Sequence, residues 1–290
     1  MRSSNLKGLL ALIGTTVLWA TSFPAIKIVM STLDAYTYTW LRSLIAALSL
    51  LPYIVYSYFK GKVSVEAVRG GLFVGVAYAL GLWLQGWGTK YTTASNSAFI
   101  TGLNVVFVHL YVSLVERRYS LNLFLSLMLS ATGLYLLTSP QVSVNIGDIL
   151  VLAGAVAWAA QVVLLSKCSR HDPVVITFFE MLPAVVFVVP SVSYLEAETF
   201  SQTIVLAIVY LALVCGNSAF ILQAYGQRFI APEIASLIFL LEPVFASVFS
   251  YIVLKEALEP LQVLGAGLIV AGMAIAEISG LKKKSSKFSR

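Results

Sequence analysis

Charged side chains are scarce in this sequence. Asp, Glu, Lys and Arg make up 11% of its 290 residues, whereas soluble domains average about 25%. So few charges could not cover the surface of a soluble domain of this length. Cysteine is scarce as well: Cys168 and Cys215 are the two in the chain, and we expect one at a helix end and the other inside a helix. The sequence therefore argues against a soluble protein and against a disulfide framework.

Apolar residues fill most of the remaining chain. Hydrophobic residues account for 59% of the sequence and the mean hydropathy is +0.90. They come in blocks of roughly 20 residues, the length of helix that crosses a hydrocarbon core ~30 Å thick. We therefore predict an all-α polytopic membrane protein with ten transmembrane helices, whose expected spans are 8–30, 35–58, 68–88, 93–115, 121–139, 148–167, 174–195, 202–222, 232–254 and 260–280.

The basic residues indicate how these spans are oriented. Ten spans place both termini on one side, and cytoplasmic loops carry an excess of Lys and Arg. When the termini are placed inside, most of the 19 lysines and arginines fall in the termini and the inner loops, such as 59–68 and 116–120. We therefore predict a plasma-membrane protein with cytoplasmic termini and external loops at 31–34, 140–147 and 196–201. The net charge of +6 then reflects topology and the lipid bilayer, and no nucleic-acid partner is expected.

An internal repeat divides the chain into two halves. "LQGWGTKYTTA" at 84–94 aligns with "LQAYGQRFIAP" at 222–232, an offset of 138, and Trp19 meets Trp158 at an offset of 139. The predicted domains are a first repeat at 1–140, a second at 141–281, and a basic cytoplasmic tail at 282–290. Because each repeat has five spans, an odd number, the second repeat enters the membrane from the opposite side. Inverted repeats of this kind are typical of secondary transporters.

Three segments carry a resemblance to a known family. The first expected helix contains "WATSFPAIK" (19–27), the second contains Arg42, and "LEPVFASVFSYIVLKEALEPLQVLGAGLIVAG" (241–272) lies near the end. In these segments the chain resembles the EamA branch of the drug/metabolite transporter superfamily. The resemblance implies two inverted five-helix repeats and export of small metabolites, such as amino acids, across the plasma membrane. Family members commonly carry the Glu242–Pro243 pair; the first repeat departs from it, with Asn104 and Val105.

Glu242 is the most unusual of the polar residues expected inside the membrane. It lies 10–11 residues into its span, about 15–16 Å at 1.5 Å per residue, which is near the midplane. Its repeat mate Asn104 is expected at the same depth. An ionisable group there is costly unless it faces protein or water, so Glu242 is either a structural partner between helices or a site for substrate or protons. We hypothesise that its protonation is coupled to transport.

Further candidates lie on the first two helices and their repeat mates. The spacing of four places Trp19, Phe23 and Lys27 on one face, and Pro24 leaves the Ala20 carbonyl free, which favours a kink. Lys27 is expected to snorkel to the membrane surface. Arg42 is expected deeper, facing a cavity or an ion partner.

The inner and outer thirds of the cavity differ in expected charge. The repeat mate of Arg42 is Glu180, so the cavity would be more positive outside and more negative inside. Gln85 and Gln223 are also mates and could line it or cap free carbonyls. The candidate substrate-binding residues are Trp19, Phe23, Arg42, Gln85, Asn104, Trp158, Gln223 and Glu242.

The sequence gives less support to functions other than transport. There is no His-Glu-x-x-His motif, no aspartate-rich metal site and no loop large enough for a catalytic domain, so we expect no metal or cofactor and no enzyme activity. The three aspartates, Asp34, Asp148 and Asp172, each precede a span and are expected to cap helices. A secondary transporter of a small molecule is the favoured function, as a monomer or a dimer. An intramembrane enzyme, or a receptor or scaffold without transport, is the alternative.

Overall fold

The structure, a computed structural model, describes residues 2–117, 120–138, 145–194, 200–245, 248 and 259–287. Within these ranges the regular structure is entirely helical. Seven helices or helix pairs are long and apolar enough to cross a membrane, and two shorter apolar helices cover Leu121–Leu137 and Pro260–Ile275. The remaining expected span, 232–254, lies partly outside the described residues. The predicted all-α membrane fold is confirmed, and the spans among the described residues are roughly consistent with ten.

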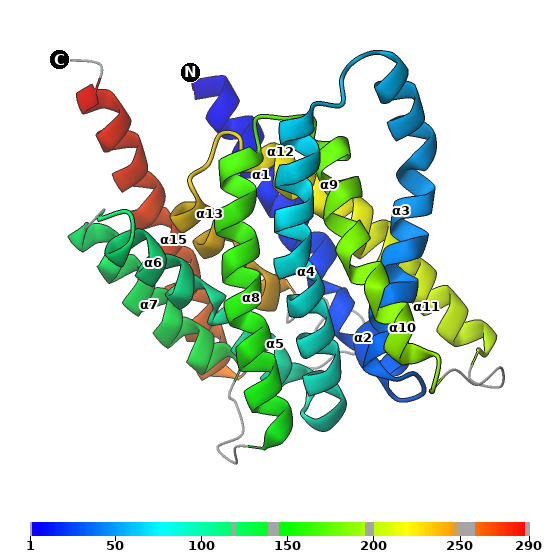
Figure 1. The fold of residues 1–290 in the computed structure, drawn as a ribbon. Helices are drawn as coiled ribbons and strands as arrows, with labels where there is room; N and C mark the ends of the chain where they lie inside the picture. Colours follow the sequence, from blue (N-terminus) through cyan, green and yellow to red (C-terminus); the bar gives the residue numbers. More distant parts are fainter. Residues whose placement is uncertain are drawn as a thin grey trace.

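The first half of the chain crosses the bundle five times (Figure 1). The third crossing is a single long helix, whereas the first and fourth are each broken in two. The elements in order are α1 (Arg2–Ala20) with α2 (Ser22–Met30), α3 (Ala35–Phe59), α4 (Val65–Tyr91), α5 (Ala94–Gly102) with α6 (Asn104–Leu114), and α7 (Leu121–Thr138).

The second half repeats this order, with different irregularities. Its seventh crossing contains a 3₁₀ segment, η1, and its eighth a π-helical segment, η3. The elements are α8 (Ile146–Cys168), α9 (Pro173–Met181) with η1 (Leu182–Phe187) and α10 (Val188–Ser191), α11 (Gln202–Ala212) with η3 (Leu213–Ser218) and α12 (Ala219–Gly226), α13 (Pro232–Phe239), and α15 (Pro260–Lys287).

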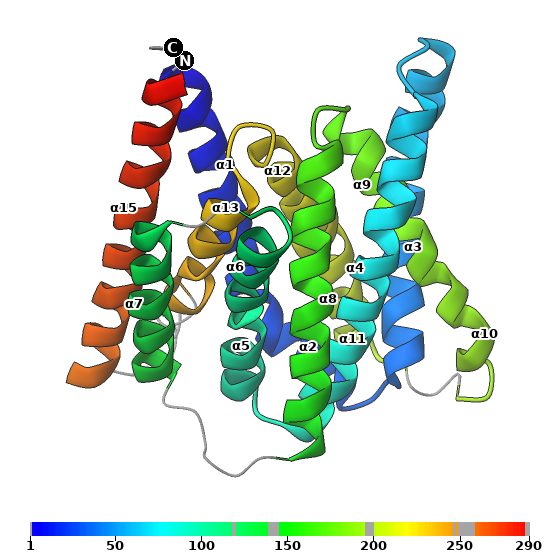
Figure 2. The same cartoon turned by 60° about the vertical axis from the view of Figure 1, so that its left-hand side comes forward.

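Both chain termini lie at the same end of the bundle (Figures 1 and 2). We call this the terminal end; it also carries the α3–α4 connection at 60–64. The opposite end, which we call the far end, carries the α2–α3 connection at 31–34 and the beginning of α8. The loop at 59–68, predicted to be inside, and the loop at 31–34, predicted to be outside, thus lie at opposite ends; the predicted loops at 116–120, 140–147 and 196–201 lie partly outside the described residues.

At several helix N-termini, a side chain accepts hydrogen bonds from the free backbone N–H groups of the first turn. The Asp34 carboxylate accepts from the backbone N–H of Tyr36 and Thr37, and Asp172 caps α9 in the same way. The expectation for Asp148 needs correcting. Asn145 is the residue that caps α8, and Asp148 is three positions further on, where its carboxylate accepts from the Asn145 N–H to complete a capping box.

Glycines bring the two halves of the chain together at repeat-related contacts. At the far end α4 meets α8, where a Cβ on Gly88 would lie 2.6 Å from the carbonyl oxygen of Gly147. At the terminal end α1 meets α12, where a Cβ on Gly226 would lie 3.0 Å from the carbonyl oxygen of Gly8. Gly88 aligns with Gly226 and Gly8 with Gly147 in the repeat. We call these contacts the far joint and the terminal joint.

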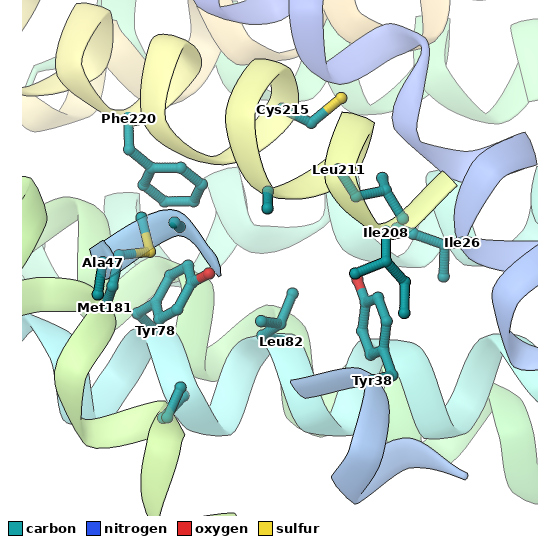
Figure 3. Close-up of a cluster of buried hydrophobic side chains, with 14 of the residues drawn as sticks. Ile26, Tyr38, Ala47, Tyr78, Leu82, Met181, Ile208, Leu211, Cys215 and Phe220 are labelled. Atoms are coloured by element: carbon teal, nitrogen blue, oxygen red, sulfur yellow. The ribbon is translucent and has the colours of Figure 1, made fainter. Parts of the chain in front are cut away.

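The apolar interior forms two main clusters. One is built by α3, α4, α9 and α11 to α12, and Figure 3 shows Tyr78, Met181 and Phe220 among the side chains that converge in it. The other is built mainly by α1, α6, α7, α8 and α13. Trp19 packs against both clusters, so it marks the boundary between them. The candidate site lies at this boundary.

Candidate functional site

A cavity opens in the middle of the bundle, and residues of both halves of the chain line it. Seven helical crossings contribute residues to it, and the ninth crossing is one of the seven. Its walls combine aromatic, small and polar side chains. They are Trp19, Ser22, Ile26, Arg42, Leu82, Gln85, Ala98, Thr101, Gly102, Asn104, Trp158, Gln161, Val162, Phe220, Ser236, Phe239, Leu240, Glu242 and Pro243.

Most of these wall residues are repeat mates of one another. At an offset of 138 or 139, a residue from the first half and its mate from the second half both line the cavity. Because mates face the same space from the two halves, the cavity lies on the axis that relates the repeats. The pairs are Trp19 with Trp158, Ser22 with Gln161, Leu82 with Phe220, Ala98 with Ser236, Thr101 with Phe239, Gly102 with Leu240, and Asn104 with Glu242.

Asn104 and Glu242 each follow a break in a helix, and both lie in the cavity wall. α5 ends at Gly102 and α6 begins at Asn104, with Leu103 between them at φ −64° and ψ −7°. In the second half α13 ends at Phe239, and Leu240 adopts φ −66° and ψ −7°. The same break therefore occurs in both repeats, directly beside the two mates. Broken helices beside a central site are typical of secondary transporters, because the break exposes polar groups to the site.

Aromatic rings form much of the wall. The Trp19 ring packs edge-on against Phe220 and Phe239, with 5.2 Å between centroids in each case. Trp158 lies 6.1 Å from Phe220, and a Cβ on Gly81 would touch its ring at 2.9 Å. The indole N–H of Trp19 donates to the Cys215 carbonyl in the π segment at 3.1 Å. The two tryptophans are thus held in place by neighbouring helices and line the cavity.

Arg42 is the cation of the cavity wall. It is 4% exposed, and its Nη1 donates to the Tyr38 hydroxyl at 2.6 Å. Within the described residues its Nε has no partner, and no ion pair joins it to Glu242. The Oδ1 atom of Asn104 is likewise buried without a described partner. The wall therefore offers a guanidinium and an amide whose hydrogen-bonding capacity is not used up, together with the Glu242 carboxyl.

A buried polar cluster stands behind the second-half wall. Gln161 Nε2 donates to Glu180 Oε1 at 2.7 Å and to Gln223 Oε1 at 3.1 Å, and Gln223 Nε2 donates back to Gln161 Oε1 at 3.0 Å. In the first half, Gln85 Nε2 donates to Thr101 Oγ1 at 3.1 Å. Gln161 was not among the predicted residues. Its place one turn after Trp158, on the same helix face, is the signal that could have found it.

Six of the eight predicted site residues line the cavity, and two do not. Trp19, Arg42, Gln85, Asn104, Trp158 and Glu242 are in its wall. Phe23 is buried in the packing at 5% exposure; its mate Val162 lines the cavity in its place. Gln223 is fully buried and lies one hydrogen bond behind the wall. Binding of a substrate by any of these residues stays a prediction.

The Lys27 ammonium group binds to another helix, whereas the sequence led us to expect that it would snorkel to the membrane surface. Its Nζ donates to the carbonyls of Thr89 and Thr92 at 2.8 and 2.6 Å, at the C-terminal end of α4. A cation is favourable there because the last carbonyls of a helix carry partial negative charge. Lys27 therefore has a structural task at the far end.

Comparisons with known proteins agree with this geometry. A family model described as "EamA-like transporter family" matches residues 6–139 and again residues 145–277. Two proteins of Archaeoglobus fulgidus, each named an uncharacterized transporter, are 30% and 26% identical to the chain over 265 and 287 residues. These alignments cover 90% and 93% of this chain and 83% and 96% of the relatives. A solved crystal structure, 16% identical, matches with a TM-score of 0.74 over 97% of this chain and 99% of its own, a likeness of fold alone.

Proposed function

The chain belongs to the EamA-like transporter family, and from this we propose that it is a secondary transporter that exports small metabolites, amino acids among them, by alternating access. The single observation that carries the mechanism is the set of repeat mates lining one central cavity. In an inverted-repeat transporter, exchange of the conformations of two like halves moves the opening from one side of the membrane to the other. A site on the axis between the halves stays in reach of both sides.

The wall chemistry supports a small substrate that carries both charges. Arg42 offers a guanidinium suited to a carboxylate, and Glu242 offers a carboxyl suited to an ammonium group. The faces of Trp19 and Trp158 suit an apolar or aromatic body between the two ends. A free amino acid combines these three parts, which is why amino acids head the candidates.

Orientation and domain division complete the proposal. The excess of Lys and Arg at the terminal end supports cytoplasmic termini in the plasma membrane, with the far end outside. The two family-model matches, 6–139 and 145–277, support five-helix repeats at 1–140 and 141–281. Export then means that substrate enters from the terminal end and leaves at the far end.

Purified protein in proteoliposomes tests the proposal. The vesicles are screened for saturable uptake of amino acids and other metabolites, with and without a pH gradient. We expect at least one substrate to be taken up, and Trp158→Ala to reduce this uptake strongly. Trp40→Ala is the matched control, because Trp40 lies on an apolar surface pocket between α3 and α11 and not at the cavity. No uptake of any compound, together with turnover of a lipid or peptide, would favour an intramembrane enzyme.

Glu242→Gln tests the proposed proton coupling. Glutamine keeps the shape and hydrogen-bonding atoms of the side chain but cannot titrate. We expect this variant to fold, to exchange substrate across the membrane, and to lose accumulation driven by a pH gradient. Full gradient-driven accumulation would eliminate Glu242 as the coupling group. Loss of folding would assign it a structural role between helices.

A further inference from the structure

The repeat mates Arg42 and Glu180 sit in different surroundings. Arg42 lines the cavity, whereas Glu180 does not and has no exposed surface. The same difference holds for Gln85 against Gln223 and for Ile26 against Leu165. In each case the first-half residue is in the wall and its second-half mate is fully buried.

This asymmetry has a direction along the bundle. Ile26 lies in the last turns of α2, Gln85 lies six residues before the end of α4, and Arg42 lies seven residues into α3. All three are in the far-end half of their helices. Their mates Leu165, Glu180 and Gln223 are in the terminal-end half, because the second repeat is inverted. At these three pairs the cavity wall therefore extends towards the far end; at the pair Phe23 and Val162 the second-half mate is in the wall instead.

We propose that in the opposite-facing conformation Glu180 lines the cavity and Arg42 is withdrawn from it. This inference rests on the proposed alternating access. When two inverted halves exchange conformations, each residue takes the surroundings that its mate has now. Glu180 then takes the place in the wall that Arg42 holds in this structure, and Arg42 becomes buried.

The contacts of Glu180 suit such a move. A single hydrogen bond, from Gln161 Nε2 to Oε1 at 2.7 Å, separates it from a residue of the cavity wall. Its Oε2 has no partner within the described residues. Tyr78 on α4 and Cys168 on α8 lie near enough to interact with its charge, and Gln161, its hydrogen-bond donor, also bonds to Gln223 on α12. None of these is a cation that would fix the carboxyl behind the wall.

The exchange would change the charge that a bound substrate meets. In this structure the wall holds a guanidinium at the far-end side, which attracts a carboxylate. In the opposite-facing conformation it would hold a carboxyl at the terminal-end side, which attracts an ammonium group and repels a carboxylate. A substrate with both groups would therefore be held by opposite ends in the two conformations. Substrates that bear only an anionic group would bind well in one conformation and poorly in the other.

Thiol labelling from each face of the membrane tests the inference. Single cysteines replace Arg42, Gln85, Glu180 and Gln223 in the Cys168→Ser/Cys215→Ser background, in sealed vesicles of both orientations. A tag on the C-terminus, open to protease or protected, reports which face is outward. We expect a membrane-impermeant methanethiosulfonate reagent to modify Glu180→Cys and Gln223→Cys from the terminal face. Arg42→Cys and Gln85→Cys should react from the far face.

Thr177→Cys is the matched control on the same helix. Thr177 is one turn from Glu180, and both it and its mate Thr39 are fully buried away from the cavity. A position that is buried in both conformations is protected by the free energy of opening the structure, so Glu180→Cys should react at least about tenfold faster than Thr177→Cys. Gln223→Cys keeps the test open if loss of the Glu180 carboxyl prevents folding.

Transport measured in the same vesicles distinguishes a failure of this inference from a failure of the proposed function. If the background protein transports substrate while positions 180 and 223 stay unreactive from both faces, the inference is overturned and the proposed function stands. Equal reactivity of positions 177 and 180 would also overturn it, because the whole helix would then be opening. If the unaltered protein transports nothing, the proposed function itself fails.

Discussion

The far joint and the terminal joint hold equivalent helices together by different side chains. Both use a pair of glycines so that backbones approach closely. At the far joint the Thr92 hydroxyl donates to Asp148 Oδ1 at 2.6 Å. The mates of these residues at the terminal joint are Ile230 and Leu9, which pack in an apolar cluster. The far joint is therefore held by a buried hydrogen bond and the terminal joint by apolar contact.

Close approach of the helices and the strength of the contact depend on different residues in the two joints. Close approach of the helices needs a residue without a side chain, and both repeats provide one at the same position. The polar groups at the far joint depend on each other, because a buried donor or acceptor that loses its partner costs more than the bond itself contributes. Apolar contacts lose their stabilising free energy more gradually as a side chain is shortened. We expect the far joint to tolerate change less well than the terminal joint.

The largest difference is expected from alanine at the joint glycines. A Cβ on Gly88 would meet backbone, 2.6 Å from the Gly147 oxygen and 2.8 Å from the Val151 nitrogen. A Cβ on Gly226 would meet mainly the Leu12 side chain, 2.6 Å from Cγ, and would lie 3.0 Å from the Gly8 oxygen. Gly88→Ala should destabilise by about 1–3 kcal/mol or more, and Gly226→Ala by clearly less. Thermal unfolding in detergent measures both, and equal losses would contradict the difference.

The next difference is expected from valine at a mate pair, Thr92 and Ile230. Thr92→Val keeps the shape but leaves Asp148 Oδ1 without its donor, which should cost about 1–3 kcal/mol. Ile230→Val removes one methylene group from an apolar contact and should cost about 0.5–1.5 kcal/mol. The measurement is again the unfolding midpoint. A larger loss for Ile230→Val would show that the hydrogen bond adds little to the far joint.

The smallest difference concerns the groups beside each joint. Lys27→Met removes the cation from the end of α4 and should cost about 0.3–1 kcal/mol, because the amine is partly exposed. Ser166 is the mate of Lys27 and accepts from Gln227 Nε2 at 2.8 Å; Ser166→Ala should cost about as much. Salt distinguishes them, since it screens the charge of Lys27. An effect of Lys27→Met that does not change between low and high salt would contradict an electrostatic role.

The sequence was sufficient for the helices and the repeat, because hydrophobic blocks and a constant offset can be read directly from it. It also identified six residues of the cavity wall, since ionisable and aromatic residues at midplane depth are rare. The break at Leu103 was missed because no proline marks it. The π segment Leu213–Ser218 was missed for a different reason. Its Cys215 carbonyl is satisfied by Trp19, a partner nearly 200 residues away in the chain.

Gln161 and Phe23 illustrate the same limit within the site. A period of four predicted that Phe23 shares a face with Trp19, but the helix breaks at Thr21 between them, so the shared face is lost. Gln161 follows Trp158 on an unbroken helix, and its place in the wall could have been predicted from that spacing. Helical periodicity therefore predicts the wall residues correctly only where the helix is unbroken.

Blocking the cavity from both halves tests most directly whether it is the transport site. Ala98 and Ser236 are small repeat mates in the wall, so a cysteine at either position should be tolerated until a bulky thiol reagent fills the space. Each variant is made in the Cys168→Ser/Cys215→Ser background, with Thr39→Cys as the buried control, and transport of an identified substrate is measured before and after modification. The account predicts that modification abolishes transport for both mates and leaves the control unchanged. Full transport by the modified Ser236→Cys protein would contradict it.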